Sequence, residues 1–159
     1  MGLEAAFDFR NINKYEEKRY SCLYRQRDLI THSFRTFLIR KMRTHDILLT
    51  EGSYSCSAYT KRDVFAAMGC DEDKYWNALQ VEAGIIVCKK NESTIHVIRE
   101  WLKWCLTDDL ITDKPNQTPN FENFIDHRHD QSILSIMRVF HNIYTTNEMR
   151  EFINCNQNQ

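Results

Sequence analysis

The feature that most constrains the fold is an apolar stretch followed at once by an amphipathic one. Residues 79–89 are mostly apolar, which is typical of a buried strand. Glu82 and Gly84 interrupt the apolar run, and a glycine inside a strand indicates that a ligand or another segment lies close to the backbone there. A helical pattern then runs from an expected cap at Ser93 to about Leu106. Its predicted buried face consists of Ile95, Ile98, Trp101, Leu102 and Cys105. A strand followed by a helix predicts an α/β fold.

The segment before residue 58 is predicted to contain a basic helical arm. Residues 13–43 include no Gly or Pro, and apolar residues recur there at three- and four-residue steps, so we expect one long helix or two abutting ones. Residues 10–43 hold ten Lys or Arg against three acids. Such an arm either binds phosphates or anionic lipid, or packs its apolar side on the rest of the chain; the second interpretation is favoured. A strand over residues 46–50 and a loop over residues 51–55 are expected to follow.

A short helix is predicted over residues 64–68 from signals at both of its ends. Thr60 and Asp63 have the spacing of a capping box, and Gly69 is the type of residue that ends a helix.

The last third of the chain is predicted to be a polar connection and two helices. The connection covers residues 107–123, and a helix follows over residues 130–142. The inward-facing residues of that helix are expected to be Ile133, Leu134, Met137 and Phe140. Thr145 and Glu148 form a second capping-box pattern before a short final helix.

Length and composition set the class of protein. The chain has 159 residues, 42% of them hydrophobic, which suits one domain. We divide it into an N-terminal segment, residues 1–57, and a second region, residues 58–159, packed together as one domain. No apolar run reaches the roughly 18 residues of a membrane span. The six cysteines contain no C-x-x-C pair, so we expect free thiols, a reducing compartment and a cytoplasmic protein.

A cluster of polar residues precedes the helix expected at residue 130. The run Asp126-His-Arg-His-Asp-Gln131 places charged and amide groups where the free N–H groups and the dipole of a helix favour phosphates or sugar hydroxyls. An aspartate beside an amide suits two vicinal hydroxyls. The alternative is that Asp130 only caps the helix while the histidines and Arg128 stay in solvent.

Glu82 and two possible metal motifs complete the set of candidates. A carboxylate inside an apolar strand either lies in a cleft, as a base or nucleophile, or faces solvent from an edge strand. His127 and His129 are two residues apart, so their side chains would point to the same side only if this segment were a strand. The Asp71 to Asp73 run is typical of a solvated turn. No metal ligands are therefore predicted.

Several blocks of the sequence resemble a known group of proteins. Residues 58–136 are similar to glycosyltransferase-like proteins of bacteria, algae and large viruses. The blocks are Thr60-Lys-Arg-Asp63, Met68-Gly-Cys-Asp71, Lys74-Tyr-Trp-Asn77, Glu82-Ala-Gly84, Glu100-Trp-Leu102, Leu110-Ile-Thr-Asp-Lys-Pro115 and Ile125-Asp-His-Arg-His-Asp-Gln-Ser132. More distantly, Glu82-Ala-Gly-Ile-Ile86 and Asp130-Gln-Ser-Ile-Leu134 resemble motifs of glycogenin-like, nucleotide-sugar-dependent transferases of GT-A fold.

The resemblance implies a fold, a reaction and a set of site residues. The fold would be a partial GT-A-like mixed sheet flanked by helices, with the N-terminal helical arm in front. The reaction would move a hexosyl group from a nucleotide-sugar to a hydroxyl of a glycan or other acceptor, with Mn²⁺ or Mg²⁺ on the donor diphosphate. The expected catalytic residues are Asp130 and Glu82, and the expected substrate-binding residues are Ala83, Gly84, His127, Arg128, His129 and Gln131.

The chain also departs from the distant family in ways that leave two functions open. Glu82 stands where that family has Asn, Ser132 stands where it has a second Asp, and residues 20–60 contain no D-x-D metal motif. The chain therefore resembles the acceptor-side half of a transferase, in which cations such as Arg128 would stabilise the leaving group. The alternative is a non-catalytic carbohydrate-binding or interaction module.

Overall fold

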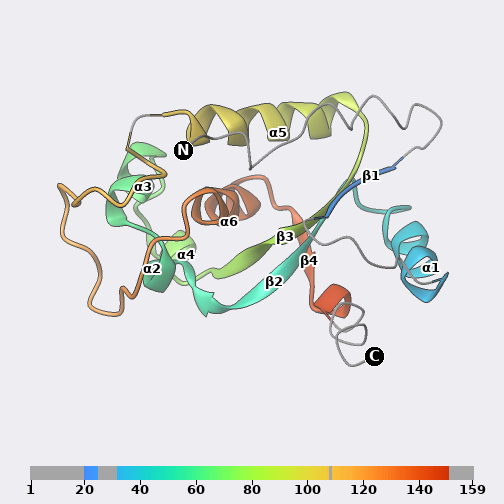
Figure 1. The fold of residues 1–159 in the computed structure, drawn as a ribbon, viewed down its shortest axis with the longest axis horizontal. Coiled ribbons are helices and arrows are strands. Elements are labelled where there is room, and N and C mark those ends of the chain that lie inside the picture. Colours follow the sequence, from blue (N-terminus) through green and yellow to red (C-terminus); the bar gives the residue numbers. More distant parts are fainter. Residues whose placement is uncertain (1–19, 25–31, 108, 151–159) are drawn as a thin grey trace.

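A four-stranded mixed sheet with helices on both faces forms the centre of the protein (Figure 1). The computed structural model describes residues 20–24, 32–107 and 109–150. The strand order is β1-β3-β2-β4; β3 is antiparallel to both of its neighbours, and β4 is parallel to β2. The strands are β1 (Tyr20–Tyr24), β2 (Ile47–Ser55), β3 (Leu79–Lys89) and β4 (Tyr144–Thr146). The predicted α/β class is confirmed.

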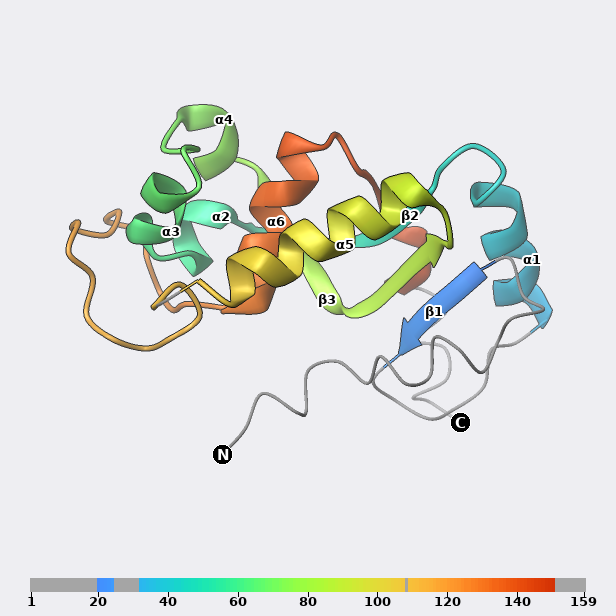
Figure 2. The same ribbon diagram turned by 90° about the horizontal axis from the view of Figure 1, so that it is seen from above.

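The helices cover the sheet unevenly. Figures 1 and 2 show α5 and α6 lying over one face, the short helices α2, α3 and α4 gathered at one end, and α1 at the opposite end. The helices are α1 (His32–Lys41), α2 (Cys56–Tyr59), α3 (Arg62–Ala67), α4 (Asp73–Trp76), α5 (Glu92–Cys105) and α6 (Asp130–Phe140). Among the described residues, no helix is long and apolar enough to cross a bilayer.

Two apolar cores lie on opposite faces of the sheet. Successive side chains of a strand point to opposite faces, so neighbouring residues of β2 and β3 contribute to different cores. Leu49 and Ile86 pack with α5 and α6 in the larger core. Leu48 and Val87, their chain neighbours, pack with Phe34 of α1 in the smaller one. The regular part of the β2–β3 ladder is therefore buried on both faces.

The β2–β3 ladder is interrupted twice. Leu49 pairs with Ile86 but Thr50 pairs with Glu82, so residues 83–85 of β3 have no partner in β2 and form a bulge in this ladder. Glu51 pairs with Val81 but Ser55 pairs with Leu79, which leaves a second bulge at residues 52–54 of β2.

Gly52 lies in the second bulge, where the two backbones come close together. A Cβ atom on Gly52 would lie 2.7 Å from the carbonyl oxygen of Gln80. Any larger residue at this position would force the backbone near Gln80 to move.

The N-terminal segment differs from the expected helical arm. Residues 20–24, inside the predicted helix of residues 13–43, form an edge strand paired with β3, and α1 begins only at His32. The rest of that prediction, residues 13–19 and 25–31, lies outside the described residues. The loop expected over residues 51–55 is also wrong, because β2 continues to Ser55. Apolar residues in this segment have the spacing of a helix, but pairing with β3, a tertiary contact, makes residues 20–24 a strand.

Two helix starts use different residues from those predicted. Thr60 and Asp63 form no capping box: Thr60 is buried and accepts a hydrogen bond from Gln80, while Asp63 accepts from a distant loop. Helix α5 is capped by Asn91, whose side-chain oxygen accepts from the Thr94 amide at 2.8 Å, and not by Ser93.

The end of α3 is as predicted. Gly69 has a φ of +66°, and the amides of Gly69 and Cys70 donate to the carbonyls of Ala66 and Phe65. These are the two hydrogen bonds of a Schellman motif.

Some of the expected buried positions are exposed. Trp101 and Ile98 of α5 contact the core, but Ile95 and Leu102 face solvent, as does Phe140 at the end of α6. The remaining inward residues of α6 are buried as predicted. Cys56, Cys70, Cys88 and Cys105 are free thiols, as expected; the side chains of Cys22 and Cys155 lie outside the described residues.

Candidate functional site

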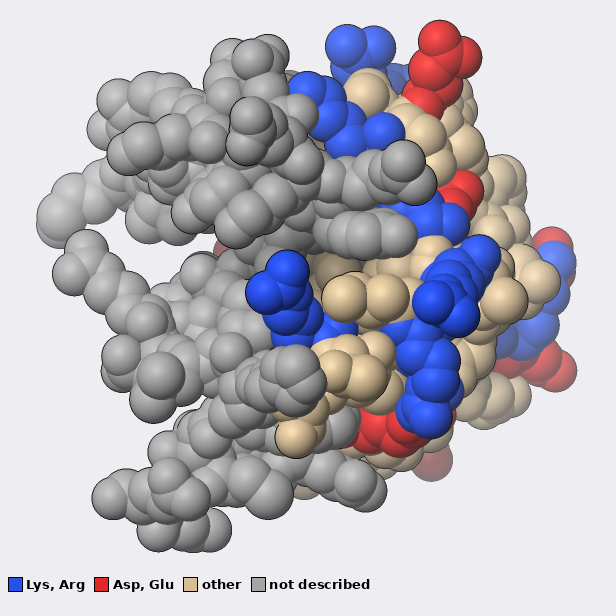
Figure 3. All heavy atoms as spheres, turned by 90° about the vertical axis from the view of Figure 1, so that its right-hand side faces the viewer, with Lys and Arg blue, Asp and Glu red and all other residues tan. Residues whose placement is uncertain are grey.

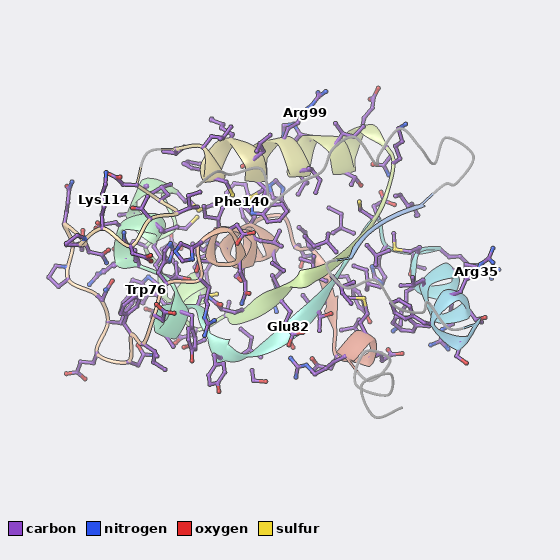
Figure 4. The ribbon with its side chains drawn as sticks, in the orientation of Figure 1. Arg35, Trp76, Glu82, Arg99, Lys114 and Phe140 are labelled. Carbon is purple, nitrogen blue, oxygen red and sulfur yellow. The ribbon has the colours of Figure 1, made fainter. Side chains whose placement is uncertain are left out.

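A pocket of about 250 Å³ opens beside the two bulges, where β2, β3, α2 and α6 meet. Three predicted site residues line it: Glu82, Arg128 and Gln131. The other lining residues are Gly52, Ser53, Tyr54, Tyr59, Gln80 and Arg150. Figure 4 shows Glu82 on the strands, with α6 between it and α5.

One wall of the pocket is aromatic. The rings of Tyr54 and Tyr59 meet edge to face with centroids 5.0 Å apart, and the guanidinium carbon of Arg128 lies 4.8 Å from the centroid of the Tyr59 ring. Tyr59 is buried at 9% exposure, whereas Tyr54 is 59% exposed. A fixed ring therefore forms the inner wall and a freely accessible ring forms the rim, with a cation held over the fixed ring.

The carbonyl oxygen of Tyr59 holds the inner end of the pocket together. It accepts hydrogen bonds from Gln80 Nε2 at 3.0 Å, from Ser132 Oγ at 2.6 Å and from the Arg128 amide at 3.1 Å. These donors come from β3, from α6 and from the segment before α6. Ser132 is fully buried, and an ionised carboxylate at its position would have no proton to donate to this carbonyl.

The charged side of the pocket is a pair of linked ion pairs. Arg150 donates to Glu82 at 2.5 Å and to the carbonyl oxygen of Glu51 at 2.7 Å. The Glu51 carboxylate binds Arg138 and accepts from Thr145. Both a cleft and a solvent-facing position were open for Glu82 from the sequence; its carboxylate lines the pocket, is partly exposed, and faces a cation there.

His127 lies near the pocket but serves the fold. It is 3% exposed; Nδ1 lies 3.4 Å from the donating Lys61 amide, and Nε2 lies 2.8 Å from the Leu110 carbonyl oxygen. Burial lowers the pKa of His127 to about 4, although the hydrogen bond to Leu110 opposes this. The ring is therefore neutral at pH 7, donates from Nε2, and joins α3 to the loop before α6.

Four other predicted site residues do not line the pocket. His129 has a φ of +50°, and its Nε2 lies 3.0 Å from Asp113. The backbone carbonyl of Asp130 accepts from Trp101 of α5, and Asp130 is not among the residues that line the pocket. Ala83 packs against the core, and Gly84 has open space where a Cβ would be.

The start of α3 holds the loop that leads to Arg128. The buried ammonium of Lys61 donates to two loop carbonyls, the Arg62 amide donates to an asparagine side chain, and the Asp63 carboxylate accepts from two loop amides. The loop partners are Thr112 and Lys114 for Lys61, Asn120 for Arg62, and Gln117 and Thr118 for Asp63. This anchoring positions the connection predicted over residues 107–123.

The donor groups of the pocket do not suit Mn²⁺ or Mg²⁺. These ions take several oxygen ligands, chiefly carboxylates, whereas the pocket offers one carboxylate, which is bound to Arg150. Within the described ranges there is no group of three or more His, Cys, Asp or Glu side chains that could hold a metal. Asp71 is likewise occupied, accepting from Trp76 and Arg62.

The basic character of the N-terminal segment is seen in α1. Figure 3 shows Lys and Arg side chains on this end of the molecule, with acidic side chains among them. Arg40 and Lys41 both pair with Glu148, and Lys41 also donates to the Tyr144 hydroxyl. Part of the charge of α1 is thus used in contacts within the protein.

Sequence reasoning missed the two tyrosines, Gln80 and Arg150. Tyr54 and Tyr59 are only five residues apart, but their meeting depends on the bulge at residues 52–54 and on the turn into α2. Arg150 reaches Glu82 from far along the chain. Only Gln80 had a local signal, a polar residue two positions before Glu82 in an apolar strand.

Comparison of the chain with models of known protein families, with curated proteins and with solved structures finds no match to any of them.

Proposed function

We propose that the pocket beside Tyr59 binds a sugar, and that the chain is a glycosyltransferase-like protein that moves a hexosyl group from a nucleotide-sugar to a hydroxyl acceptor. The observation that carries this proposal is the combination of an aromatic wall, a side-chain amide and a paired carboxylate around one small pocket. The apolar C–H face of a pyranose packs on an aromatic ring, while amides and carboxylates bind its hydroxyls.

The size of the pocket favours a small ligand group. Its volume of about 250 Å³ lies below the roughly 300–1,000 Å³ of sites that enclose drug-sized ligands. One sugar ring fits this size better than a whole nucleotide-sugar. The nucleotide part of a donor would then extend past the exposed Tyr54 and Arg128.

The roles follow from the charges around the pocket. In a transfer step, the acceptor hydroxyl bonds to the anomeric carbon, the bond from that carbon to the diphosphate oxygen breaks, and the nucleoside diphosphate leaves with the electron pair. In the proposed step Glu82 accepts the hydroxyl proton, and Arg128 and Arg150 balance the charge of the leaving group; the support is that all three line the pocket. Asp130 has no part in this step, because it does not line the pocket.

A partial GT-A-like fold belongs to the same proposal. A mixed sheet flanked by helices supports it, and so does a site that uses residues on either side of the bulged part of β3. A reducing, cytoplasmic environment is also proposed, supported by the four free cysteines.

The second candidate function is a non-catalytic carbohydrate-binding module. The observation that favours it is the engagement of Glu82 by Arg150, because a base that is held in an ion pair is a weaker proton acceptor. This module would use the same pocket, so the two candidates differ in turnover and not in binding.

An assay of donor turnover separates the two functions. The protein is incubated with UDP- and GDP-hexoses, with and without Mn²⁺, and release of the nucleoside diphosphate is followed with and without simple glycan acceptors. If the protein is a transferase, the wild type releases the nucleoside diphosphate faster than the Glu82→Gln variant does. Sugar binding without release by either protein would support the module, and a release rate unaffected by Glu82→Gln would remove Glu82 from the mechanism.

A further inference from the structure

The side chains of Gln80 and Gln131 form a fixed pair of amides at the inner end of the pocket. Gln131 Nε2 lies 3.1 Å from Gln80 Oε1, and both residues line the pocket. Gln80 is 3% exposed, whereas Gln131 is partly exposed. The two ends of an amide have opposite hydrogen-bonding character, so the orientation of each matters to a ligand.

The orientation of Gln80 is set by the backbone of α2. Its Nε2 lies 3.0 Å from the Tyr59 carbonyl oxygen and 3.1 Å from Thr60 Oγ1. A carbonyl oxygen can only accept, so a reversed Gln80 would place two acceptors against each other in a buried site. The NH₂ group of Gln80 must therefore face Tyr59, and its Oε1 must face Gln131.

The orientation of Gln80 in turn sets that of Gln131. Because Gln80 presents an acceptor, Gln131 must turn its NH₂ group toward it, and the Oε1 of Gln131 then points away from Gln80. No described residue donates a hydrogen bond to that oxygen. The backbone of Gln131 is held as well, since its carbonyl accepts from Ser135 Oγ at 2.7 Å.

We infer that Gln80 is a positioning residue that fixes Gln131 as an oriented hydrogen-bond acceptor, so that the pocket selects ligands with a donating hydroxyl at that point. The inference rests on the proposed function, because it assumes that the ligand is a sugar. The inference also predicts selectivity. A sugar that carries a fluorine, or an oxygen that can only accept, opposite Gln131 Oε1 should bind more weakly than one with a hydroxyl there. A neighbouring acceptor left without a donor costs binding energy.

The orientation can be tested without a ligand. In ¹⁵N spectra of the full chain, the side-chain NH₂ groups of Gln80 and Gln131 are expected to exchange with solvent about tenfold more slowly than that of the exposed Gln117. In Gln80→Leu, the Gln131 signal is expected to exchange as fast as the Gln117 signal. Fast exchange of both pocket amides in the wild type would overturn the inference.

The selectivity is tested with fluorinated sugars. UDP-glucose and its analogues with one hydroxyl replaced by fluorine are titrated against the wild type, Gln80→Leu, Gln131→Met and the control Gln117→Leu. Fluorine keeps the size of the hydroxyl but cannot donate. At one ring position, fluorination is expected to weaken binding about tenfold in the wild type and the control, and less than about threefold in the two pocket variants.

The outcomes separate this inference from the proposed function. Gln131→Met leaves the buried contacts of Gln80 with Tyr59 intact, so it serves if Gln80→Leu fails to fold. Equal binding of every fluorinated analogue by the wild type would overturn the inference while leaving sugar binding in place. Slow exchange of both amides in a protein that binds no nucleotide-sugar would support the fixed acceptor and overturn the proposed function.

Discussion

The two ends of the β2–β3 ladder are built in opposite ways. At one end, residues 47–49 pair in regular register with residues 86–88, and aliphatic side chains are buried on both faces. At the other end, two bulges break the register, and amides, ion pairs and tyrosines gather around a pocket. The regular end stabilises the fold through burial of apolar side chains. The bulged end has fewer hydrogen bonds between the strands, and its polar side chains line the pocket.

The largest expected effect lies at the regular end. Leu49 is fully buried in the larger core, so Leu49→Ala is expected to lower the free energy of unfolding by about 2–5 kcal/mol through lost burial and a cavity. Denaturant titration measures this. The exposed Leu102 supplies the control, for which Leu102→Ala should change stability by less than about 0.5 kcal/mol. Similar losses in both variants would mean that Leu49 is not a core residue.

His127, near the bulged end, should make a contribution to stability that depends on pH. The pKa of His127 falls from 6.5 to about 4 in the folded protein, so between these values the unfolded chain binds more protons than the folded one. The contribution of His127 is complete above pH 6.5 and is lost as the pH falls toward 4, by about 3 kcal/mol in total.

The measurement is the free energy of unfolding from pH 4 to 8 for the wild type and for His127→Asn, with His96→Asn, on the exposed side of α5, as the control. The slope between pH 6.5 and 4 should become shallower only in the His127 variant. An unchanged slope would show that His127 is protonated in the fold or exposed to solvent.

The close approach between the backbones of Gly52 and Gln80 at the β2 bulge can be tested by adding one methyl group to Gly52. Gly52→Ala places a Cβ atom 2.7 Å from the carbonyl oxygen of Gln80 and is expected to cost about 1–3 kcal/mol, because a backbone atom must move. Gly84→Ala is the matched control, since it meets open space and should be nearly neutral. Thermal unfolding of both variants distinguishes them, and a neutral Gly52→Ala would contradict the close approach.

The smallest expected effect is on the loop that leads to Arg128. Burial opposes ionisation of Asp63, but hydrogen bonds from the amides of Gln117 and Thr118 outweigh it and hold the pKa of Asp63 below its usual value. Asp63→Asn should therefore cost about 1 kcal/mol at pH 7 and speed amide exchange in the loop. Asp73→Asn, at the start of α4, is the control, and equal effects of the two would remove the anchoring role.

Local patterns predicted the regular elements well. The limits of β3 and the positions of α5 and α6 follow from apolar periodicity over ten or more residues, and the structure has them close to where they were expected. The strand at residues 20–24 and the extension of β2 to Ser55 could not be found in this way. Their backbones are held by pairing with β3, which no local pattern encodes.

The candidate site was predicted only in part for the same reason. Glu82, Arg128 and Gln131 have the expected chemistry and meet at one pocket, whereas His127 and Asp130 belong to the same polar run but do not line the pocket. A run of polar residues around a helix start points in several directions, so sequence proximity did not imply a shared site. Arg150 joins Glu82 only through the tertiary fold.

The most direct test of the account is a calorimetric titration of UDP- and GDP-hexoses into three proteins. These are the wild type, Arg128→Gln at the mouth of the pocket, and Arg99→Gln on the outer side of α5, where Figure 4 shows its side chain pointing away from the sheet. We predict that the wild type and Arg99→Gln bind one of the sugars with equal affinity and that Arg128→Gln binds it about tenfold more weakly. No binding by the folded wild type, or equal binding by all three proteins, would contradict a sugar site in this pocket.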